Sequence, residues 1–438
     1  MIDHRTLRVA LLGAGSVGSQ VANLLLERAD ELEERAGARL ELAGIAVRDV
    51  DAPRDAPLPR ELLTTDAHEL IVGSDIVIEL MGGMEPARTH ILDALRSGAD
   101  VVTGNKALLA THGAEIFEVA DQVGATVSYE AAVAAAIPIV RPLKDSLAGD
   151  RVRRIFGIVN GTTNYILDRM DKEGADFDAV LADAQALGFA EADPTADVAG
   201  HDAAQKAAIL ASLAFHTNVP LDQVHCEGIT SIDAAAIDNA RKAGFVIKLL
   251  ATCERLAAEG DEEEAISVRV YPALVDREHP LASVHGGNNA VYVEAEAAGP
   301  LMFYGAGAGG VETASAVLGD VVSAARRHIA GGVGVGESAR GDAPIAPIGR
   351  ITTRYQITLD VTDEQGVLAA VAGLLSDGGV SVATVEQTVS EDASGTSRAR
   401  LVIGTHSARE QALSDTVETL AAADVVERVV SVLRVEGD

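Results

Sequence analysis

A glycine-rich loop near the start of the chain has the spacing of a dinucleotide-binding fingerprint. It follows residues 8–12, which are typical of a short buried strand, and precedes residues with the apolar spacing of a helix. In such loops the first glycine permits a tight turn, the second lets a pyrophosphate approach the backbone, and the third lets the helix pack on the strand. The pyrophosphate lies at the positive end of the helix. A glycine turn without a ligand is the alternative. The full context favours cofactor binding through Gly13, Gly15, Ser16, Val17 and Gly18.

The end of the next expected strand bears on which nicotinamide cofactor is bound. NAD-binding proteins place a carboxylate there for the ribose hydroxyl, whereas NADP-binding proteins place a cation for the 2′-phosphate. Arg48 comes first in this stretch, and Asp49 and Asp51 follow it. The two acids weaken the positive field, and a plain surface role for Arg48 is the alternative. We expect NADP(H) to be preferred over NAD(H).

The densest group of chemically active side chains lies between residues 186 and 206. Asp202 and Lys206 are four residues apart in an expected helix, so they share one helix face. Carboxylates with few neighbouring cations suit a positively charged group, such as the ammonium of an amino acid. A solvated acidic loop is an equally good explanation in so acidic a chain, and a divalent-metal site is a third. The carboxylates are those of Glu191, Asp193, Asp197 and Asp202.

Two lysines stand out because the chain contains only six, all between Lys106 and Lys248. Lys106 follows the expected strand 100–103, at the carboxyl end where doubly wound sheets bind ligands. Lys206 can serve as a proton donor once it is removed from solvent. A solvent-exposed side chain is the ordinary alternative for either one. Both are candidates for a reaction site.

Alternating strands and helices over residues 1–134 predict an α/β domain with a parallel sheet and helices on both faces. Residues 135–310 mix strands with long helices and predict a separate α+β lobe. We expect the segment 311–330 to complete the first domain. The expected strands are 8–12, 40–47, 75–80, 100–103, 125–130, 152–160, 265–272 and 290–296, and the expected helices are 86–97, 115–123, 202–215, 239–254 and 314–330.

A stretch rich in glycine and proline, residues 331–350, predicts a linker. Beyond it the residues follow the order strand, helix, strand, strand, helix, strand up to residue 438. Alternation of Tyr355, Ile357 and Leu359 marks the first of these strands. Residues 351–438 therefore predict a small βαββαβ domain.

Composition excludes two classes of partner. Acids outnumber bases 66 to 35, the net charge is −31, and no basic face is available for nucleic acid or an acidic membrane. The uncharged apolar runs are shorter than the ~18–20 residues of a membrane span, and no signal pattern opens the sequence. Cys226 and Cys253 cannot form a disulfide framework and fit a reduced setting. We expect a cytoplasmic protein.

Five motifs occur in a fixed order along the chain. They are the loop 13–18, Asn105-Lys106, residues 130–139, residues 157–167 and residues 188–206, the last being the most specific. Together they resemble the homoserine dehydrogenase family, in its long form with a C-terminal ACT domain, over essentially the whole chain. The resemblance implies NAD(P)H-dependent interconversion of L-aspartate 4-semialdehyde and L-homoserine, in threonine, methionine and isoleucine biosynthesis.

The resemblance also implies roles for individual residues. Lys206 would donate a proton to the substrate oxygen or accept one from it, and Lys106 would position nicotinamide and substrate. Glu191 and Asp202 would hold the substrate, chiefly its ammonium. The implied cofactor cleft would also include Lys106, Gly188, Glu191 and Gly305.

A monovalent cation, Na⁺ or K⁺, is a further implication of the resemblance. It would brace the join between the lobes, bound by backbone oxygens and one carboxylate. The matching positions are Glu130, Val133, Ala135 and Ile137. Ala135-Ala136 stands where the family commonly has glycine, and an alanine suits this place only if the backbone does not need a positive φ.

The C-terminal domain resembles ACT modules, which bind small amino acids at paired interfaces. The turn 363–368 fits the ACT turn into the first helix, and the resemblance implies inhibition by L-threonine and a homo-oligomer, dimer or tetramer. An assembly domain without ligand is the alternative for this part. For the whole chain, the alternatives are a non-catalytic amino-acid sensor and a dehydrogenase of another small amino-acid carbonyl. The presence of Lys106, Glu191, Asp202 and Lys206 together speaks against the sensor.

Overall fold

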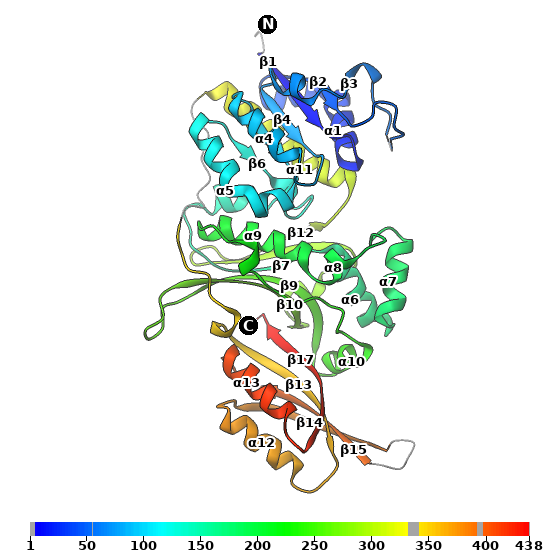
Figure 1. Ribbon diagram of the computed structural model, residues 1–438, viewed down its shortest axis with the longest axis vertical. Coiled ribbons are helices and arrows are strands. Elements are labelled where there is room, and N and C mark those ends of the chain that lie inside the picture. Colours follow the sequence, from blue (N-terminus) through cyan, green and yellow to red (C-terminus); the bar gives the residue numbers. More distant parts are fainter. Residues whose placement is uncertain (1–4, 55, 332–340, 392–396, 438) are drawn as a thin grey trace. The chain divides into compact units, whose positions relative to one another are not determined.

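The computed structural model describes residues 5–54, 56–331, 341–391 and 397–437 (Figure 1). The chain divides into two compact units. The first comprises residues 1–161, 203–222 and 287–343, and the second comprises residues 162–202, 223–286 and 344–438. In the described part of the chain, no helix is both long and apolar enough to span a membrane. The domain limits drawn from the sequence stay a prediction.

A parallel six-stranded sheet organises the first unit, with the strand order β3-β2-β1-β4-β5-β6 (Figure 1). Strands β4 and β5 are buried along their whole length, so their apolar runs lack the alternation of a one-sided sheet. The predicted α/β fold is confirmed. The strands are β1 (Thr6–Leu12), β2 (Arg39–Ala46), β3 (Leu63–Thr64), β4 (Ile76–Glu79), β5 (Asp100–Thr103) and β6 (Val127–Ser128). The helices between them are α1 (Ser16–Glu27), α2 (Ala29–Ala36), α3 (Ala67–Ile71), α4 (Ala87–Arg96) and α5 (Lys106–Val123).

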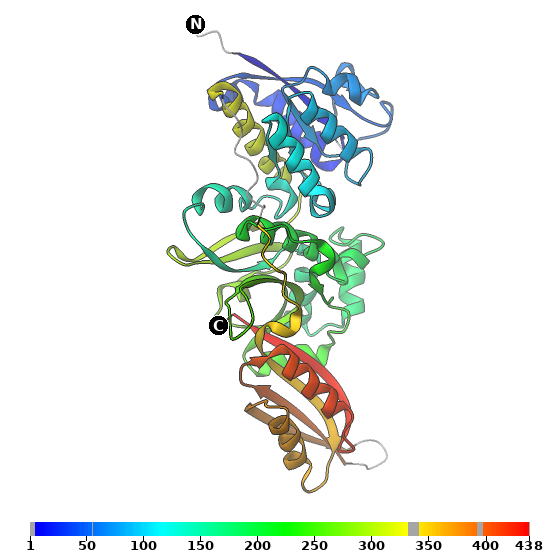
Figure 2. The same cartoon turned by 60° about the vertical axis from the view of Figure 1, so that its left-hand side comes forward.

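Helix α11 (Gly310–Ala330) returns to this sheet from far along the chain (Figures 1 and 2). Its residues Ala314, Val317 and Val321 belong to the same buried core as Val21 and Leu25 of α1. The segment 311–330 therefore packs into the core of the first unit, and the helix begins slightly earlier than the sequence predicted.

The first unit also contains a small antiparallel sheet in the order β12-β11-β7. Its strands are β7 (Val152–Ile158), β11 (Asn288–Ala295) and β12 (Gly299–Ala306). Helix α9 (His201–Phe215) enters the first unit at Ala203, and most of its residues are buried. The sequence predicted this helix correctly.

The second unit is built on a long antiparallel strand pair, β9 (Phe245–Leu256) and β10 (Ala265–Asp276). The predicted helix 239–254 is wrong. A helix ends at Lys242, and Gly244, with φ +86°, turns the chain into β9. Residues 246–253 are all buried, so both strand faces are covered and no alternation could reveal a strand. The other elements here are α6 (Gly161–Glu173), α7 (Phe177–Ala186), α8 (Thr195–Val198), β8 (His225–Cys226) and α10 (Ala234–Lys242).

The C-terminal segment of the second unit has the predicted βαββαβ order, with one added two-residue strand. Both helices pack on one face of a sheet in the order β17-β13-β15-β14 (Figures 1 and 2). Strand β17 also pairs in parallel with β10, which places both strands in one sheet. The elements are β13 (Thr352–Thr362), α12 (Val367–Asp377), β14 (Val382–Glu391), β15 (Ser397–Thr405), β16 (Ala408–Arg409), α13 (Glu410–Ala421) and β17 (Val426–Glu436).

The stretch predicted as a linker is held by main-chain hydrogen bonds where the structure describes it. Residues 332–340 lie outside the described residues. In the first unit, the N–H of Gly341 donates to the carbonyl oxygen of His216 (2.7 Å). In the second unit, Ile266 donates to the carbonyl oxygen of Pro344 (2.9 Å) and accepts from Ala346 (2.8 Å). The described end of this stretch is therefore held by hydrogen bonds to the main chain of other residues.

Candidate active site

The glycine loop lies between β1 and α1, and its three glycines meet different surroundings. A Cβ atom on Gly13, whose φ is +101°, would stand 2.6 Å from the carbonyl oxygen of Leu80. One on Gly18 would stand 2.2 Å from the carbonyl oxygen of Gly13. Gly15 has no atom within 4 Å of that position. The tight glycines shape the turn and the helix packing, whereas Gly15 leaves the open space that a pyrophosphate would fill. The loop therefore fits a dinucleotide.

One cavity of about 340 Å³ in the first unit brings several predicted site residues together. Ser16 and Val17 line it from the glycine loop, and Lys106 and Lys206 line it from α5 and α9. Val133 and Ala135, two of the predicted cation ligands, also line it. These residues, far apart in the sequence, thus line one cavity, whereas the predicted substrate-binding residue Asp202 does not line it.

Lys206 is buried on α9, with an exposed fraction of 9%. Its Nζ atom donates a hydrogen bond of 2.7 Å to the carbonyl oxygen of Val159, the residue after β7. Asp202 lies one turn earlier on α9 and is equally buried. The helix therefore presents a carboxylate and an ammonium from one face, as the spacing predicted.

Lys106 is the first residue of α5, which begins well before the predicted helix 115–123. The missed signal is Asn105, whose side-chain oxygen accepts the N–H of Leu108 (3.2 Å) and caps the helix. The Asn105 amide also donates to the carbonyl oxygen of Gly83 (2.7 Å). The backbone N–H of Asn105 donates to the hydroxyl of Thr103 (3.0 Å). These contacts fix the backbone where the chain leaves β5. The side chain of half-buried Lys106 therefore extends from a fixed backbone position.

The acidic segment belongs to the second unit and follows α7. Gly188 has φ +77° and ends that helix, and Glu191 is exposed. The Gln185 side chain donates to the carbonyl oxygens of Glu191 (3.0 Å) and Ala192 (3.3 Å), which holds the segment against α7. Neither Gly188 nor Glu191 lines the cavity of the two lysines. Their roles toward cofactor and substrate stay predictions.

Arg48 and Gly305 also lie outside the lining of that cavity. Arg48 is exposed two residues after β2, and no ion pair of it is recorded in the described part of the chain. Asp51 forms an ion pair with Arg60 (2.7 Å). Gly305 lies on β12, where a Cβ atom would meet the Ile137 side chain at 3.2 Å. Gly305 therefore makes room for one of the predicted cation ligands.

At the predicted cation site, three backbone carbonyl oxygens accept no recorded hydrogen bond from the described residues, whereas the carboxylate of Glu130 already accepts several. Among the described residues, no recorded hydrogen bond ends on the carbonyl oxygen of Val133, Ala135 or Ile137, although all three residues are buried. Ala135 has φ +50°, the left-handed conformation that favours glycine. Carbonyl oxygens without a hydrogen bond are what a small cation binds, but a positive φ is the condition under which an alanine does not suit this place, so the backbone fits the ion only in part.

The side chain of Glu130 fits this role less well. One of its oxygens accepts the N–H groups of Ile139 (2.6 Å) and Val140 (2.7 Å). The other accepts both the N–H and the Nε–H of Arg141, each at 3.0 Å. Four donors use the four acceptor positions of a carboxylate. Glu130 therefore braces residues 139–141 in this conformation. The described residues include no cluster of three or more His, Cys, Asp or Glu that could hold a metal.

A second buried acid, which the sequence did not single out, lies beside Glu130. Asp320 of α11 accepts the N–H of Glu130 (2.8 Å) and lies 3.5 Å from the Arg141 guanidinium. Burial raises the pKa of Asp320 to about 7, against the opposing effect of the Glu130 N–H. Nothing in its local sequence distinguishes it from other helix-surface acids, because its burial depends on α11 returning to the sheet.

A second glycine loop, residues 307–310, lies in the cavity wall and was not predicted from the sequence. A Cβ atom on Gly307 would stand 2.3 Å from the side-chain amide of Asn289. One on Gly310 would stand 2.9 Å from the hydroxyl of Ser16. The Asn289 amide is fully buried and has no hydrogen-bond partner among the described residues. The cluster of glycines before a helix was the available signal.

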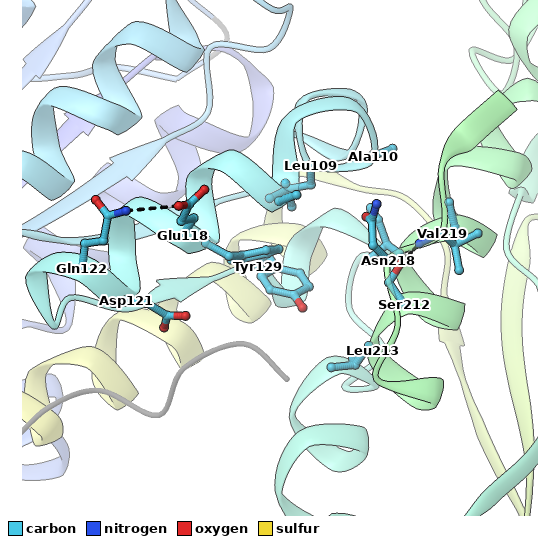
Figure 3. Close-up of a pocket in the computed structure, with 15 residues that line it drawn as sticks. Leu109, Ala110, Glu118, Asp121, Gln122, Tyr129, Ser212, Leu213, Asn218 and Val219 are labelled. Carbon is cyan, nitrogen blue, oxygen red and sulfur yellow. Dashed lines mark hydrogen bonds between the residues drawn. The ribbon is translucent and has the colours of Figure 1, made fainter. Parts of the chain in front are cut away.

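A larger cavity, of about 460 Å³, lies farther along α5 and α9 in the same unit (Figure 3). Leu109 and Leu213 line its apolar wall, and Glu118 and Asp121 contribute carboxylates. It contains neither lysine and no residue of either glycine loop. Size alone therefore does not identify the reaction site.

Family models match most of the chain. The model described as "Homoserine dehydrogenase, NAD binding domain" matches residues 13–130, and the model described as "Homoserine dehydrogenase" matches residues 138–322. Two relatives called homoserine dehydrogenase are each 54% identical to this chain. The one from Corynebacterium glutamicum aligns over 98% of this chain and 96% of its own length, and the one from Mycobacterium leprae over 99% of both.

Solved structures agree with these matches. A homoserine dehydrogenase from Thiobacillus denitrificans is 36% identical, with a TM-score of 0.90 and coverage of 99% of both chains. A hyperthermophilic archaeal homoserine dehydrogenase in complex with NADPH is 26% identical, with a TM-score of 0.59. That match covers 73% of this chain and 97% of the archaeal one.

Proposed function

Since the chain belongs to the homoserine dehydrogenase family and is an NAD(P)-dependent oxidoreductase, we propose that it interconverts L-aspartate 4-semialdehyde and L-homoserine in the cavity of Lys106 and Lys206. One observation carries the proposal. Both lysines line the same cavity as Ser16 and Val17 of the glycine loop. Hydride transfer requires cofactor and substrate in contact, and this cavity offers both a place.

Lys206 is the proposed acid and base at the substrate oxygen. Bound nicotinamide supplies the hydride in the reducing direction. As the aldehyde carbon accepts the hydride, negative charge develops on its oxygen. The Lys206 ammonium stabilises this charge and delivers the proton that completes the alcohol. In the oxidising direction the amine takes that proton back. The Val159 carbonyl holds Nζ in place for both steps.

Lys106, Glu191 and Asp202 are the proposed substrate-holding residues. Lys106 extends into the cavity from the capped start of α5 and would orient the substrate next to nicotinamide. The carboxylates of Glu191 and Asp202 would bind the substrate ammonium, as the family resemblance implies. Asp202 precedes Lys206 by one turn, so one helix would hold the amino group and protonate the oxygen.

NADP(H) is the proposed preferred cofactor. Asp51 is paired with Arg60, and the carboxylate of Asp49 accepts the N–H of Asp51 (2.8 Å). Local contacts thus engage both acids and leave exposed Arg48 as the group suited to a 2′-phosphate. An archaeal relative was solved with NADPH. Replacing Arg48 with Ala should lower kcat/KM for NADPH and leave that for NADH unchanged.

A monovalent cation is the proposed structural ion near the cavity. The carbonyl oxygens of Val133, Ala135 and Ile137 would bind it, and Glu130 would contribute through its position beside them. The bound ion would stabilise the left-handed turn at Ala135. A rise in melting temperature with Na⁺ or K⁺, absent with a bulky organic cation, would test this.

The C-terminal βαββαβ segment is the proposed regulatory part, an ACT module that binds L-threonine. A cavity of about 450 Å³ lies at the predicted turn and includes Thr362, Glu364 and Gly366. Gly366, with φ +94°, is the N-cap of α12, and the N–H groups of that helix end suit a carboxylate. We also propose a cytoplasmic homo-oligomer, as the resemblance implies.

The test of the proposed function is the fall in NADPH absorbance with L-aspartate 4-semialdehyde, with and without L-threonine, repeated with NADH. Rapid oxidation that threonine slows supports both the reaction and the regulatory module. Oxidation indifferent to threonine removes the effector and keeps the reaction. If folded protein supplied with Na⁺ or K⁺ oxidises neither cofactor, the reaction is rejected and a non-catalytic sensor becomes the better explanation.

A further inference from the structure

Residues 225–229 of the second unit, the 225–229 strap, lie between the C-terminal module and the turn that precedes α9. The strap begins as β8, which pairs with β10 through Cys226 and Val270. The N–H of Glu227 continues this pairing to the carbonyl oxygen of Val270 (2.8 Å). Glu227 then contacts the C-terminal module, and Cys226 and Ile229 contact the turn 198–200.

Arg434 of β17 ties the strap to the C-terminal module. Its guanidinium donates to the two carboxylate oxygens of Glu227 at 3.0 and 2.9 Å. It also donates to Glu410, the first residue of α13, from Nε (3.0 Å) and Nη2 (2.7 Å). The guanidinium carbon lies 4.5 Å from the ring centre of Tyr271 on β10. Arg434 thus joins β17, α13, β10 and the strap.

The charged groups of Arg434 and Glu410 are largely removed from solvent and paired with one another. The Arg434 side chain is 12% exposed and that of Glu410 is 4% exposed. Burial opposes ionisation of Glu227, but hydrogen bonds from His225 and Arg434 outweigh it and lower the pKa of Glu227 to about 2. An arginine this buried depends on its partners, because removing one leaves a charge without compensation.

The other side of the strap packs on the turn 198–200. A Cβ atom on Gly228 would stand 2.2 Å from the carbonyl oxygen of Val198. The N–H of Ile229 donates to that same oxygen (2.8 Å). The Cys226 thiol donates to the carbonyl oxygen of Ala199 (3.4 Å). This turn leads directly into α9, whose second residue is Asp202. The strap therefore contacts the residues that lead into the start of α9.

We propose that Arg434 and Glu227 are positioning residues for the dehydrogenase reaction. Through the strap they hold the turn 198–200, and with it the place of Asp202. This inference rests on the proposed role of Asp202 in substrate binding. It also supplies a physical route by which an effector bound to the C-terminal module reaches the substrate site.

The kinetic test compares Arg434→Met with wild type in the oxidation of L-homoserine. We expect the KM for homoserine to rise about tenfold, because Asp202 is no longer held, while the KM for NADP⁺ stays within about twofold. The matched control is Arg428→Met. Arg428 lies on the same strand and pairs with Asp360 (2.8 Å) inside the module, so this variant should keep wild-type constants.

A thiol measurement gives a second readout. Cys226 touches the turn, whereas Cys253 is fully buried. Loosening the strap should make Cys226 of the Arg434→Met variant react faster with a disulfide reagent, and Arg428→Met should react like wild type. If Arg434→Met does not fold, Glu227→Gln repeats both tests, since it leaves Arg434 paired with Glu410.

The outcomes separate this inference from the proposed function. A selective rise in homoserine KM together with faster Cys226 reaction supports it. A folded variant with unchanged homoserine KM overturns it, as does an equal rise in both KM values. If threonine does not inhibit the wild-type protein, only the effector proposal fails, and the KM comparison still decides the role of Arg434. If wild type has no activity at all, the proposed function fails first.

Discussion

The Nζ atom of Lys206 lies 2.7 Å from the carbonyl oxygen of Val159, so the main chain after β7 fixes the amine of a residue on α9. A lysine side chain has four rotatable bonds, and an unheld amine would lose entropy on every turnover. The contact orders the amine before substrate binds. It also links the motif around residue 159 to the motif around residue 206 in one physical interaction.

Lys206→Met should lose most turnover while folding normally. Proton transfer by a positioned group typically contributes 10²–10⁴-fold, so we expect kcat to fall by about 10³-fold. Steady-state kinetics and thermal unfolding should be measured together. Lys172→Met, which changes a half-exposed lysine on α6, is the control and should keep its rate. Turnover near the wild-type level in Lys206→Met would remove the residue from the mechanism.

Gly15→Ala should separate cofactor binding from folding. Nothing in the protein lies within 4 Å of the new methyl group, and φ is −74°, so stability should change by less than about 1 kcal/mol. The methyl group would occupy the space of the pyrophosphate, and the KM for NADPH should rise roughly tenfold. Gly13→Ala, with φ +101° and a 2.6 Å clash, should instead lose at least ~2 kcal/mol. Equal effects of both substitutions would contradict this division.

Ala135→Gly should be almost neutral for stability. Removing a buried methyl group costs about 0.8 kcal/mol and added backbone freedom costs about 0.5–1 kcal/mol. Relief of the left-handed strain at φ +50° returns about 1–2 kcal/mol. Ala134→Gly, next to it and fully buried, has no such relief and should lose about 1.5 kcal/mol. Urea unfolding of the two variants tests this, and equal losses would show that Ala135 is unstrained.

Lys248 should make stability depend on pH above neutrality. Its amine is buried and donates to Asn164 (2.9 Å) and to the carbonyl oxygen of Val284 (2.6 Å). Burial lowers the pKa of Lys248 to about 8, partly opposed by Asp168. The unfolded chain therefore binds more protons between pH 8 and the unfolded pKa of ~10.4. This contribution to stability is present above that range and is lost as the pH falls through 8.

The corresponding measurement is the free energy of unfolding of wild type and Lys248→Met between pH 7 and pH 10. The difference between them should shift toward wild type by at most ~1.4 kcal/mol per pH unit from pH 8 upward. Lys242→Met, an exposed lysine paired with Asp238, should run parallel to wild type. Parallel curves for Lys248→Met would mean that the amine titrates equally in both states.

Most of what could be predicted about the site came from residue spacing within short stretches of the sequence. The glycine loop and the pair Asp202 and Lys206 are set by spacing within one turn or one helix, so the sequence displays them. The helix predicted over 239–254 failed because β9 is covered on both faces, and a two-sided burial pattern has no period. Gly244 was the local signal of this boundary, since it lies between the end of α10 and the start of β9.

Long-range contacts explain what the sequence could not reveal. The ion pair of Arg434 with Glu227 joins residues 207 positions apart. Asp320 becomes buried only where α11 returns to lie beside Glu130 and Arg141. The positive φ of Ala135 was raised as a condition from the family resemblance, but only the backbone geometry established it. In each case the chemistry of the residue depends on a partner that no local pattern names.

The pairing of β10 with β17 has a consequence for how the protein is made. Residues 273–275 are hydrogen-bonded to residues 434–436, and Arg269 contacts Glu436 across 167 positions of sequence. At ~5–20 residues per second, a ribosome needs roughly 10–30 s to synthesise that interval. Until then this length of β10 has an unpaired edge, which is a site for aggregation. Strand β9 covers only the opposite edge of β10, so this edge stays open to another chain until β17 has been made.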